Sequence, residues 1–330
     1  MDKRAFLVKL SLASPMLVMI FAAYAFAQPV ADPADGPVVI AAPAPWTTLR
    51  SDSVVVSVQA DLGALPRGTI DFKVVRRSGT RASTLFSRSV KMEEPSADVF
   101  LGRVRDMPVG GNAFLSIEWS VPGSELKGAV EPIGAIRLFG EVTADNRWSP
   151  AQAPQVAIKL SDGISGTQAA EALAAAPSFE VSGMKFSAGW NSVGLFIRFI
   201  PDAAVTGVDF AFDLKCGKNA FLAWADRFVV YSAAGDGVTG QHFGKRAVDK
   251  DGIKSEELSW GSNNSPGLEK AETARVMMVR WPDLGMQPFE DRNIGFAVFA
   301  NGRAAKRPAS YPVAADRSVP GTWGDLRLAK

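Results

Sequence analysis

The stretch "RWPDLGMQPFEDRNIGFAVFANG", residues 280–302, contains the pattern on which the fold prediction depends. Its apolar segment from Ile294 to Asn301 is typical of a buried strand, and the polar residues from Pro282 to Arg292 are typical of a loop. Trp281 then ends the preceding apolar segment, 274–281. We therefore expect Trp281 at the edge of a core, between two strands, and not on a binding surface.

Strand-like segments of this kind recur along the whole chain. Turn signals such as "MPVGGN" and "VPGSELKG" separate those of the first half, and Trp119 lies where its ring would pack between two sheets. The pattern predicts an all-β protein with two tandem antiparallel β-sandwiches, the first immunoglobulin-like and the second of jelly-roll type. The segments are 51–61, 68–78, 97–104 and 112–121, then 193–200, 207–215, 226–233, 274–281 and 293–301.

The domain boundaries follow from changes in composition. The first sandwich is expected over 46–142 and the second over 156–330, with a proline-containing linker at 143–155 between them. One short helix is expected within 166–179, because that segment is rich in alanine. Strands do not alternate with helices, which argues against a parallel α/β enzyme fold.

The N-terminus predicts export. Residues 1–27 have a positive start, an apolar stretch and the small-residue site Ala25-Phe26-Ala27, which together are typical of a cleaved signal peptide; residues 28–45 follow as an extended leader. Removing residues 1–27 lowers the formal net charge from +2 to about 0. No basic stripe remains, so nucleic acid is not an expected partner. No transmembrane segment is expected after cleavage.

Catalytic and metal-binding residues are scarce. His242 is the single histidine and Cys216 the single cysteine, which argues against a zinc site and excludes an intramolecular disulfide. No nucleophile elbow, P-loop or dinucleotide fingerprint is present, which argues against an enzyme. The segment "DKDGIKSEE" fails the EF-hand spacing but leaves open an irregular calcium site at Asp249, Asp251 and Glu256.

Residues 156–330 resemble the family 9 carbohydrate-binding modules and the wider DOMON-like sandwich group. The resemblance rests on the segments "MKFSAGWNSVGLFIRFI", "GVDFAFDLK" with "WADRFVVYSA", "VMMVRWPDLGMQPFEDRNIGFAVFANG" and "PGTWGDLRLAK", in that order. It implies a non-catalytic sandwich whose characterised members clamp sugar chain ends between two tryptophans. The corresponding loops here, "PDAAVTG" and "VAADRSV", contain no aromatic residue.

The function expected from this resemblance is carbohydrate binding, or association with a cell-envelope glycan, by an exported protein. Other residues would then contact the ligand, and the candidates are Trp260, Asn263, Asn264, Trp224 and Tyr311. Trp190, Trp281 and Trp323 are expected in the core. A structural or interaction scaffold without sugar binding is the competing class. Haem held by Met277 or Met278 is a remote third, because packing on an alternating strand accounts for both residues.

Overall fold

The first sandwich consists of two sheets packed around a core. The computed structural model of the chain describes residues 36–105, 107, 109–136, 140–142, 148–150, 154–260, 266–303 and 307–330. One sheet has the order β1-β3-β6 and the other has the order β2-β8-β7-β4-β5. The strands are β1 (Val38–Ala42), β2 (Thr48–Leu49), β3 (Ser53–Ala60), β4 (Thr69–Ser78), β5 (Arg81–Lys91), β6 (Ser96–Arg103), β7 (Ala113–Ser120) and β8 (Lys127–Ala135).

Alternating burial explains why these segments form strands. Val54, Val56 and Val58 of β3 are fully buried, while the residues between them are not. Such a period of two places one face of each strand on the core. Trp119 is half-buried and packs against that core, as expected.

Two features of this sandwich differ from the sequence prediction. The leader predicted over 28–45 is wrong in part, because Val38–Ala42 form β1 and pair with β3. The pairing of β2 with β8 is parallel, so this sandwich is not purely antiparallel. The signal peptide predicted over 1–27 lies outside the described residues, as does most of the linker predicted over 143–155. The described pieces near that linker are the paired strands β9 (Gly140–Val142) and β10 (Trp148–Pro150).

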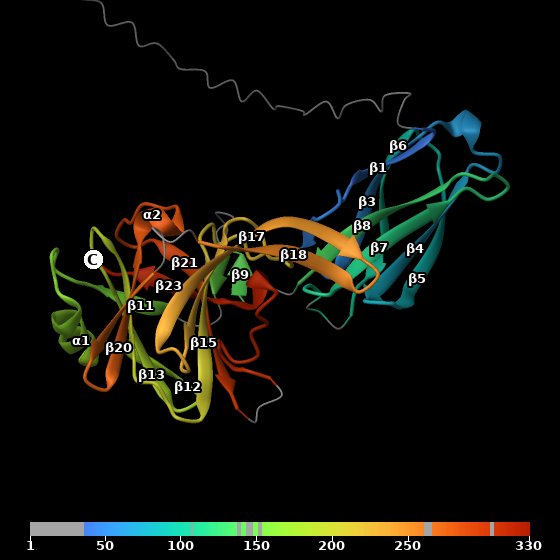
Figure 1. The fold of residues 1–330 in the computed structure, drawn as a ribbon. Helices are drawn as coiled ribbons and strands as arrows, with labels where there is room; N and C mark the ends of the chain where they lie inside the picture. The colour runs from blue at the N-terminus through green and yellow to red at the C-terminus, as the bar shows by residue number, and fades with distance from the viewer. Residues whose placement is uncertain are drawn as a thin grey trace, which may run out of the picture. The chain divides into compact units, whose positions relative to one another are not determined.

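The second sandwich is formed by one continuous hydrogen-bonded ladder that folds into two layers (Figure 1). Its order is β18-β17-β16-β15-β21-β23-β11-β13-β14-β20-β19, with β12 on β13 and β22 on β21. The central strand β11 pairs in parallel with both β13 and β23, again an exception to the predicted antiparallel pattern. The elements are β11 (Gln155–Lys159), α1 (Gly166–Ala174), β12 (Ser178–Val181), β13 (Met184–Trp190), β14 (Gly194–Phe199), β15 (Val205–Asp213), β16 (Asp226–Ser232), β17 (Gly237–Asp249), β18 (Gly252–Ser259), β19 (Gly267–Ala271), β20 (Ala274–Arg280), α2 (Trp281–Leu284), β21 (Asn293–Gly302), β22 (Ala309–Tyr311) and β23 (Gly324–Leu328).

Strand β15 shows how the layers are built. Val208, Phe210 and Phe212 point into the main core between the layers, together with side chains of β13, β14 and β20. The residues between them face the outside of the layer, where Ala211 joins a second apolar cluster with Phe228, Phe243, Phe299 and Trp323. Both faces of β15 are therefore covered, and a few polar side chains interrupt the outer one.

The stretch 280–302 folds largely as its pattern predicts. Strand β20 ends at Arg280, and Trp281 is buried, with its Nε1 donating to the carbonyl of Asn191 at 2.8 Å. The predicted loop contains the short helix α2, which ends at Gly285 with a φ of +67°, a conformation that glycine adopts without strain. The next strand, β21, runs through the centre of the sheet. The all-β prediction is confirmed.

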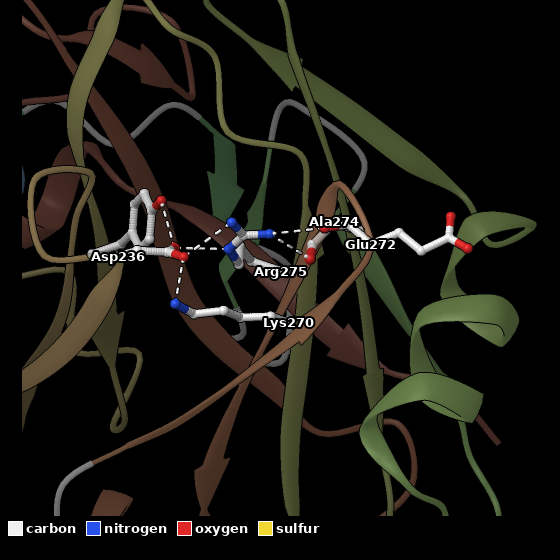
Figure 2. A network of polar contacts seen from close by, with 6 residues as sticks. Asp236, Lys270, Glu272, Ala274 and Arg275 are labelled. Atoms are coloured by element: carbon white, nitrogen blue, oxygen red, sulfur yellow. Dashed lines mark hydrogen bonds and ion pairs between the residues drawn. The ribbon is translucent and has the colours of Figure 1, made fainter.

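A polar network joins the two layers at one end of the second sandwich (Figure 2). Asp236, in the turn between β16 and β17, accepts from Arg275 at 2.7 and 3.0 Å and forms an ion pair with Lys270 at 2.7 Å. The hydroxyl of Tyr231 donates to the same carboxylate, whereas the side chain of Glu272 points away from it. Arg275 holds the pKa of the Asp236 carboxyl well below its usual range. Through these partners, the Asp236 carboxylate links the β16–β17 turn to the β19–β20 hairpin.

The two sandwiches contact each other through apolar side chains and through hydrogen bonds beside them, such as those from Gly111 N to the Ala220 carbonyl and from Ala220 N to the Thr48 hydroxyl. A small apolar cluster combines Phe114 and Ile136 of the first with Ala220, Phe221 and Val319 of the second. Residues Pro37–Lys330 accordingly form one compact unit.

Candidate functional site

Charged and polar side chains gather at the middle of the outer face of the β15–β18 layer. They lie outside the main apolar core. Asp209 of β15 and Gln241 of β17 lie on this face, and Arg317 reaches it from the loop between β22 and β23. Phe243 and Glu257 are opposite each other on β17 and β18, so their side chains lie on the same face. Residues of three strands and one loop therefore meet at this position.

Arg317 is held in a fixed orientation. Its Nε donates to the Asp209 carboxylate at 2.7 Å, and its guanidinium carbon lies 4.3 Å from the centre of the Phe228 ring. Nη2 approaches the amide oxygen of Gln241 at 3.5 Å. Nη1 lies 3.9 Å from the carboxylate of Glu257, which is too far for a hydrogen bond. One edge of an immobilised guanidinium thus faces a carboxylate across a gap.

A pocket of about 330 Å³ opens beside this gap. Its apolar wall comes from the loop between β15 and β16 and from the β17–β18 hairpin, and its polar groups surround Arg317. We call it the Arg317 pocket. It is lined by Phe221, Leu222, Phe243, Ile253, Ser255, Glu257, Arg317 and Ser318 of the second sandwich and by Gly111 and Asn112 of the first.

Lys218 fastens the two loops that form the pocket. Its ammonium donates to the carbonyls of Trp323 and Gly324, both at 2.8 Å, and forms an ion pair with Asp325 at 2.9 Å. The backbone N–H of Lys218 donates to Asp213 at 2.9 Å. The loop carrying Phe221 is therefore tied to the segment that follows Arg317.

Three buried aspartates lie in one row across the strands beneath these loops. Asp226 is opposite Asp213, Asp213 is opposite Gly295, and Gly295 is opposite Asp325. Glycine is needed within this row, because a Cβ at residue 295 would lie 2.7 Å from that of Asp213. Burial raises the pKa of Asp325 despite its lysine partner, and burial with the nearby Asp213 raises that of Asp226 well above its usual value.

The ligand-contact candidates chosen from the sequence differ in their exposure to solvent. Trp260 was expected in a polar loop but is 8% exposed, because its ring covers Gly240 of the adjacent strand. Tyr311 is half-buried, packs 4.6 Å from Phe179 and accepts a hydrogen bond from Gln155. Neither presents an open aromatic face. Asn263 and Asn264 lie outside the described residues.

Trp224 is the candidate whose side chain is accessible to a ligand. It is 62% exposed, whereas the side chains of Trp46, Trp119, Trp190, Trp260, Trp281 and Trp323 are buried or half-buried. It follows the pocket residues Phe221 and Leu222 on the same loop. Trp190, Trp281 and Trp323 are buried, which confirms their assignment to the core.

The calcium candidates do not form a site. Asp249 and Asp251 lie in the β17–β18 turn and both pair with Lys254, at 2.6 and 3.6 Å. Hydrogen bonding to Lys254 lowers the pKa of Asp249. The Glu256 side chain lies beside Gly244, farther along the hairpin. The described residues contain no group of three or more His, Cys, Asp or Glu side chains suited to a metal ion.

The remaining catalytic and haem candidates are accounted for by packing. Cys216 contacts the carbonyl of Asn293, and burial raises the pKa of its thiol to about 12, so it is protonated at neutral pH. His242 contacts the ring of Trp224. Met277 is buried in the main core, and Met278 packs against the separate cluster beneath α1.

Sequence reasoning missed the residues that form the pocket. Arg317 and Asp209 are 108 positions apart, and Glu257 lies on a hairpin whose register the pattern did not define. The one local signal was the charged residue Asp209 inside the apolar segment "GVDFAFD". A buried charge in a strand requires a partner, and that partner is Arg317.

The comparisons with known proteins give fold likenesses only. No family model matches the chain, and no curated protein matches it in sequence. Among solved structures, it is similar to a family 9 carbohydrate-binding module from Caldicellulosiruptor kristjanssonii in complex with cellotriose. That match has 13% identity and a TM-score of 0.34, and it covers 54% of this chain and 94% of that one. An ICAM-5 D1–D4 ectodomain fragment matches with 13% identity and a TM-score of 0.21, covering 88% of this chain and 53% of that one.

Proposed function

We propose that this protein is an exported, non-catalytic carbohydrate-binding protein, and that the Arg317 pocket holds a sugar ring. The observation that carries the proposal is the 3.9 Å gap between Arg317 Nη1 and the Glu257 carboxylate, at the mouth of a pocket with apolar residues in its lining. A hydroxyl group both donates and accepts, so one sugar hydroxyl inserted there accepts from the guanidinium and donates to the carboxylate.

The rest of the pocket suits the same ligand class. Ile253 offers apolar surface to the C–H face of a pyranose, with the buried rings of Phe221 and Phe243 behind it, and Ser255 and Ser318 add hydroxyl groups to the lining. Arg317 and Glu257 have opposite charges, which favours a neutral ligand over an ionic one. Because Asp209 and Phe228 hold the guanidinium beforehand, little conformational entropy is lost on binding.

The non-catalytic part of the proposal is supported by Cys216 and His242. Cys216 is half-buried and protonated, and its thiol contacts a backbone carbonyl; His242 contacts an indole ring. Export rests on the composition of residues 1–27. No helix within the described segments has the length and apolar character to span a bilayer.

A glycan array followed by calorimetry tests the proposal. Glu257→Ala removes the acceptor side of the gap, and we expect it to weaken binding about tenfold or more, since hydrogen bonds to charged groups are among the strong ones. Glu256→Ala is the matched control, because it removes an exposed carboxylate from the opposite face of the same strand. Equal losses in both variants would place the sugar elsewhere. No binding to any glycan would favour an interaction scaffold.

A further inference from the structure

Trp224 occupies an exposed position that packing does not explain. Its side chain is 62% exposed, although an indole is among the largest apolar groups a protein can bury. It lies in the loop before β16, and its ring meets the imidazole of His242 edge to face, with centroids 4.9 Å apart. The Arg227 guanidinium also lies over the ring, and the rest of the indole is exposed.

The backbone around Trp224 is rigid. The Asp226 carboxylate accepts from the N–H of Ala223 at 2.6 Å, and the N–H of Asp226 donates to the carbonyl of Ala223 at 2.9 Å. Arg227 donates to the carbonyl of Trp224, and its guanidinium carbon lies 5.4 Å from the centre of the indole. The exposed ring therefore follows a hydrogen-bonded turn and packs against a buried cation.

Strand β17, which carries His242, presents one polar side chain between two glycines on the face nearest Trp224. In "GQHFG", Gly240, His242 and Gly244 share one face of β17, and the Trp260 ring covers Gly240. Neither nitrogen of His242 has a hydrogen-bond partner among the described residues. Burial and the nearby Arg227 lower the pKa of His242, so the imidazole is neutral at neutral pH and offers one donor and one acceptor.

We propose that Trp224 and His242 form a second carbohydrate-binding site, where a neutral sugar ring stacks on the indole and its hydroxyls bond to the imidazole. A fixed aromatic ring beside a neutral group that both donates and accepts matches the two surfaces of a pyranose. The site extends the proposed function but shares no residue with the Arg317 pocket. Phe243, which lines the pocket, points to the opposite face of β17 from His242.

Two separated sites on one domain favour polymers over short sugars. A chain held at one site is presented to the other at a high effective concentration, so retention on an insoluble polysaccharide exceeds that of either site alone. Loss of one site therefore reduces retention on the polymer more than it reduces affinity for a hexasaccharide at the other site.

The single histidine makes this site directly observable. Protein labelled with 13C-histidine is titrated with neutral hexasaccharides of glucose, of mannose and of N-acetylglucosamine, and the imidazole resonance of His242 is followed. We expect at least one hexasaccharide to shift it in the wild type. Trp224→Ala should abolish the shift and weaken binding at this site about tenfold, whereas Trp224→Tyr keeps an aromatic ring and should retain most of it. Phe289→Ala, which removes an exposed aromatic ring elsewhere, should change nothing.

The two sugar sites can fail separately. Glu257→Ala should leave the response of His242 intact, because Glu257 lies on the pocket face. The proposal is overturned if no hexasaccharide moves the His242 resonance in the wild type. It is equally overturned if Trp224→Ala, with unchanged near-ultraviolet circular dichroism apart from the lost indole, shows the same shift as the wild type.

Discussion

Replacing Lys218 by methionine should destabilise the protein strongly. The ammonium lies among two carbonyl oxygens and the Asp325 carboxylate, and the two charged side chains are 2% and 1% exposed. Methionine is similar in length and meets the same backbone, because the φ of +48° at residue 218 is unchanged by the substitution. The substitution therefore removes the charge and its three contacts with little change in volume.

The expected loss follows from these contacts. Removing one partner of a buried ion pair costs about 3–5 kcal/mol, because the other charge stays buried without compensation. At about 2–4 °C per kcal/mol for a chain of this size class, Tm should fall by roughly 6–20 °C. Lys215→Met is the control, because that lysine is exposed on the same loop and should change stability by less than about 0.5 kcal/mol.

A double-mutant cycle with Asp325→Asn separates the pair from other effects. Guanidinium denaturation of the four proteins should give a coupling free energy of about 1–3 kcal/mol. Asparagine at 325 is neutral, so removing the Lys218 ammonium then leaves no buried charge without a counter-ion. The loss in Lys218→Met should also shrink in acid. Burial raises the pKa of Asp325, and a protonated carboxyl requires no counter-ion. Additive losses in the cycle, or a loss below about 1 kcal/mol, would refute the reasoning.

Three further outcomes are expected. Asp226→Asn should raise the free energy of unfolding at neutral pH. Burial raises the pKa of Asp226, so the stability of the wild type falls as the pH rises above the usual carboxyl pKa of 3.8. Asparagine does not ionise, so denaturation measured from pH 4 to 8 should not show this fall in the variant. His242 should titrate below pH 6.5 by NMR, and Trp224→Ala should move its pKa up toward 6.5 by exposing the ring. Gly295→Ala should destabilise by about 1–3 kcal/mol through overpacking, whereas Gly235→Ala, whose new Cβ meets nothing within 4 Å, should not; thermal unfolding distinguishes them.

Much of the fold could be predicted because its strands carry local patterns. The segment "GVDFAFD" alternates between core and outer-face residues, and the apolar run from Ile294 to Asn301 falls within β21 (Asn293–Gly302). The helix expected in 166–179 is present as Gly166–Ala174, where Ser165 and Gln168 form a capping box. Strand β5 was missed, because its eleven residues lie at a sheet edge and are nearly all exposed, so no apolar alternation marks them.

The site was harder to predict, because its residues meet through register. Trp260 looked like a surface residue from its polar neighbours, yet it fills the space left by Gly240, which only the pairing of β17 with β18 places beneath it. The same limit applies to Lys218 and Asp325, which are 107 positions apart but meet where two loops close over one layer. A local pattern identifies a strand, but it does not identify the strand's neighbours.

The segment "GQHFG" shows how one strand serves both proposed sites. Gln241 and Phe243 face Arg317 and the pocket, while Gly240 faces Trp260, His242 faces Trp224, and Gly244 lies beside Glu256 and Leu258. Because Gly240 has no side chain, the Trp260 indole can cover it, and the half-buried imidazole next to it packs against the Trp224 ring. Because alternate residues point to opposite faces, each site can change without altering the other. A substitution at Gln241 should therefore affect the pocket alone, and one at His242 the Trp224 site alone.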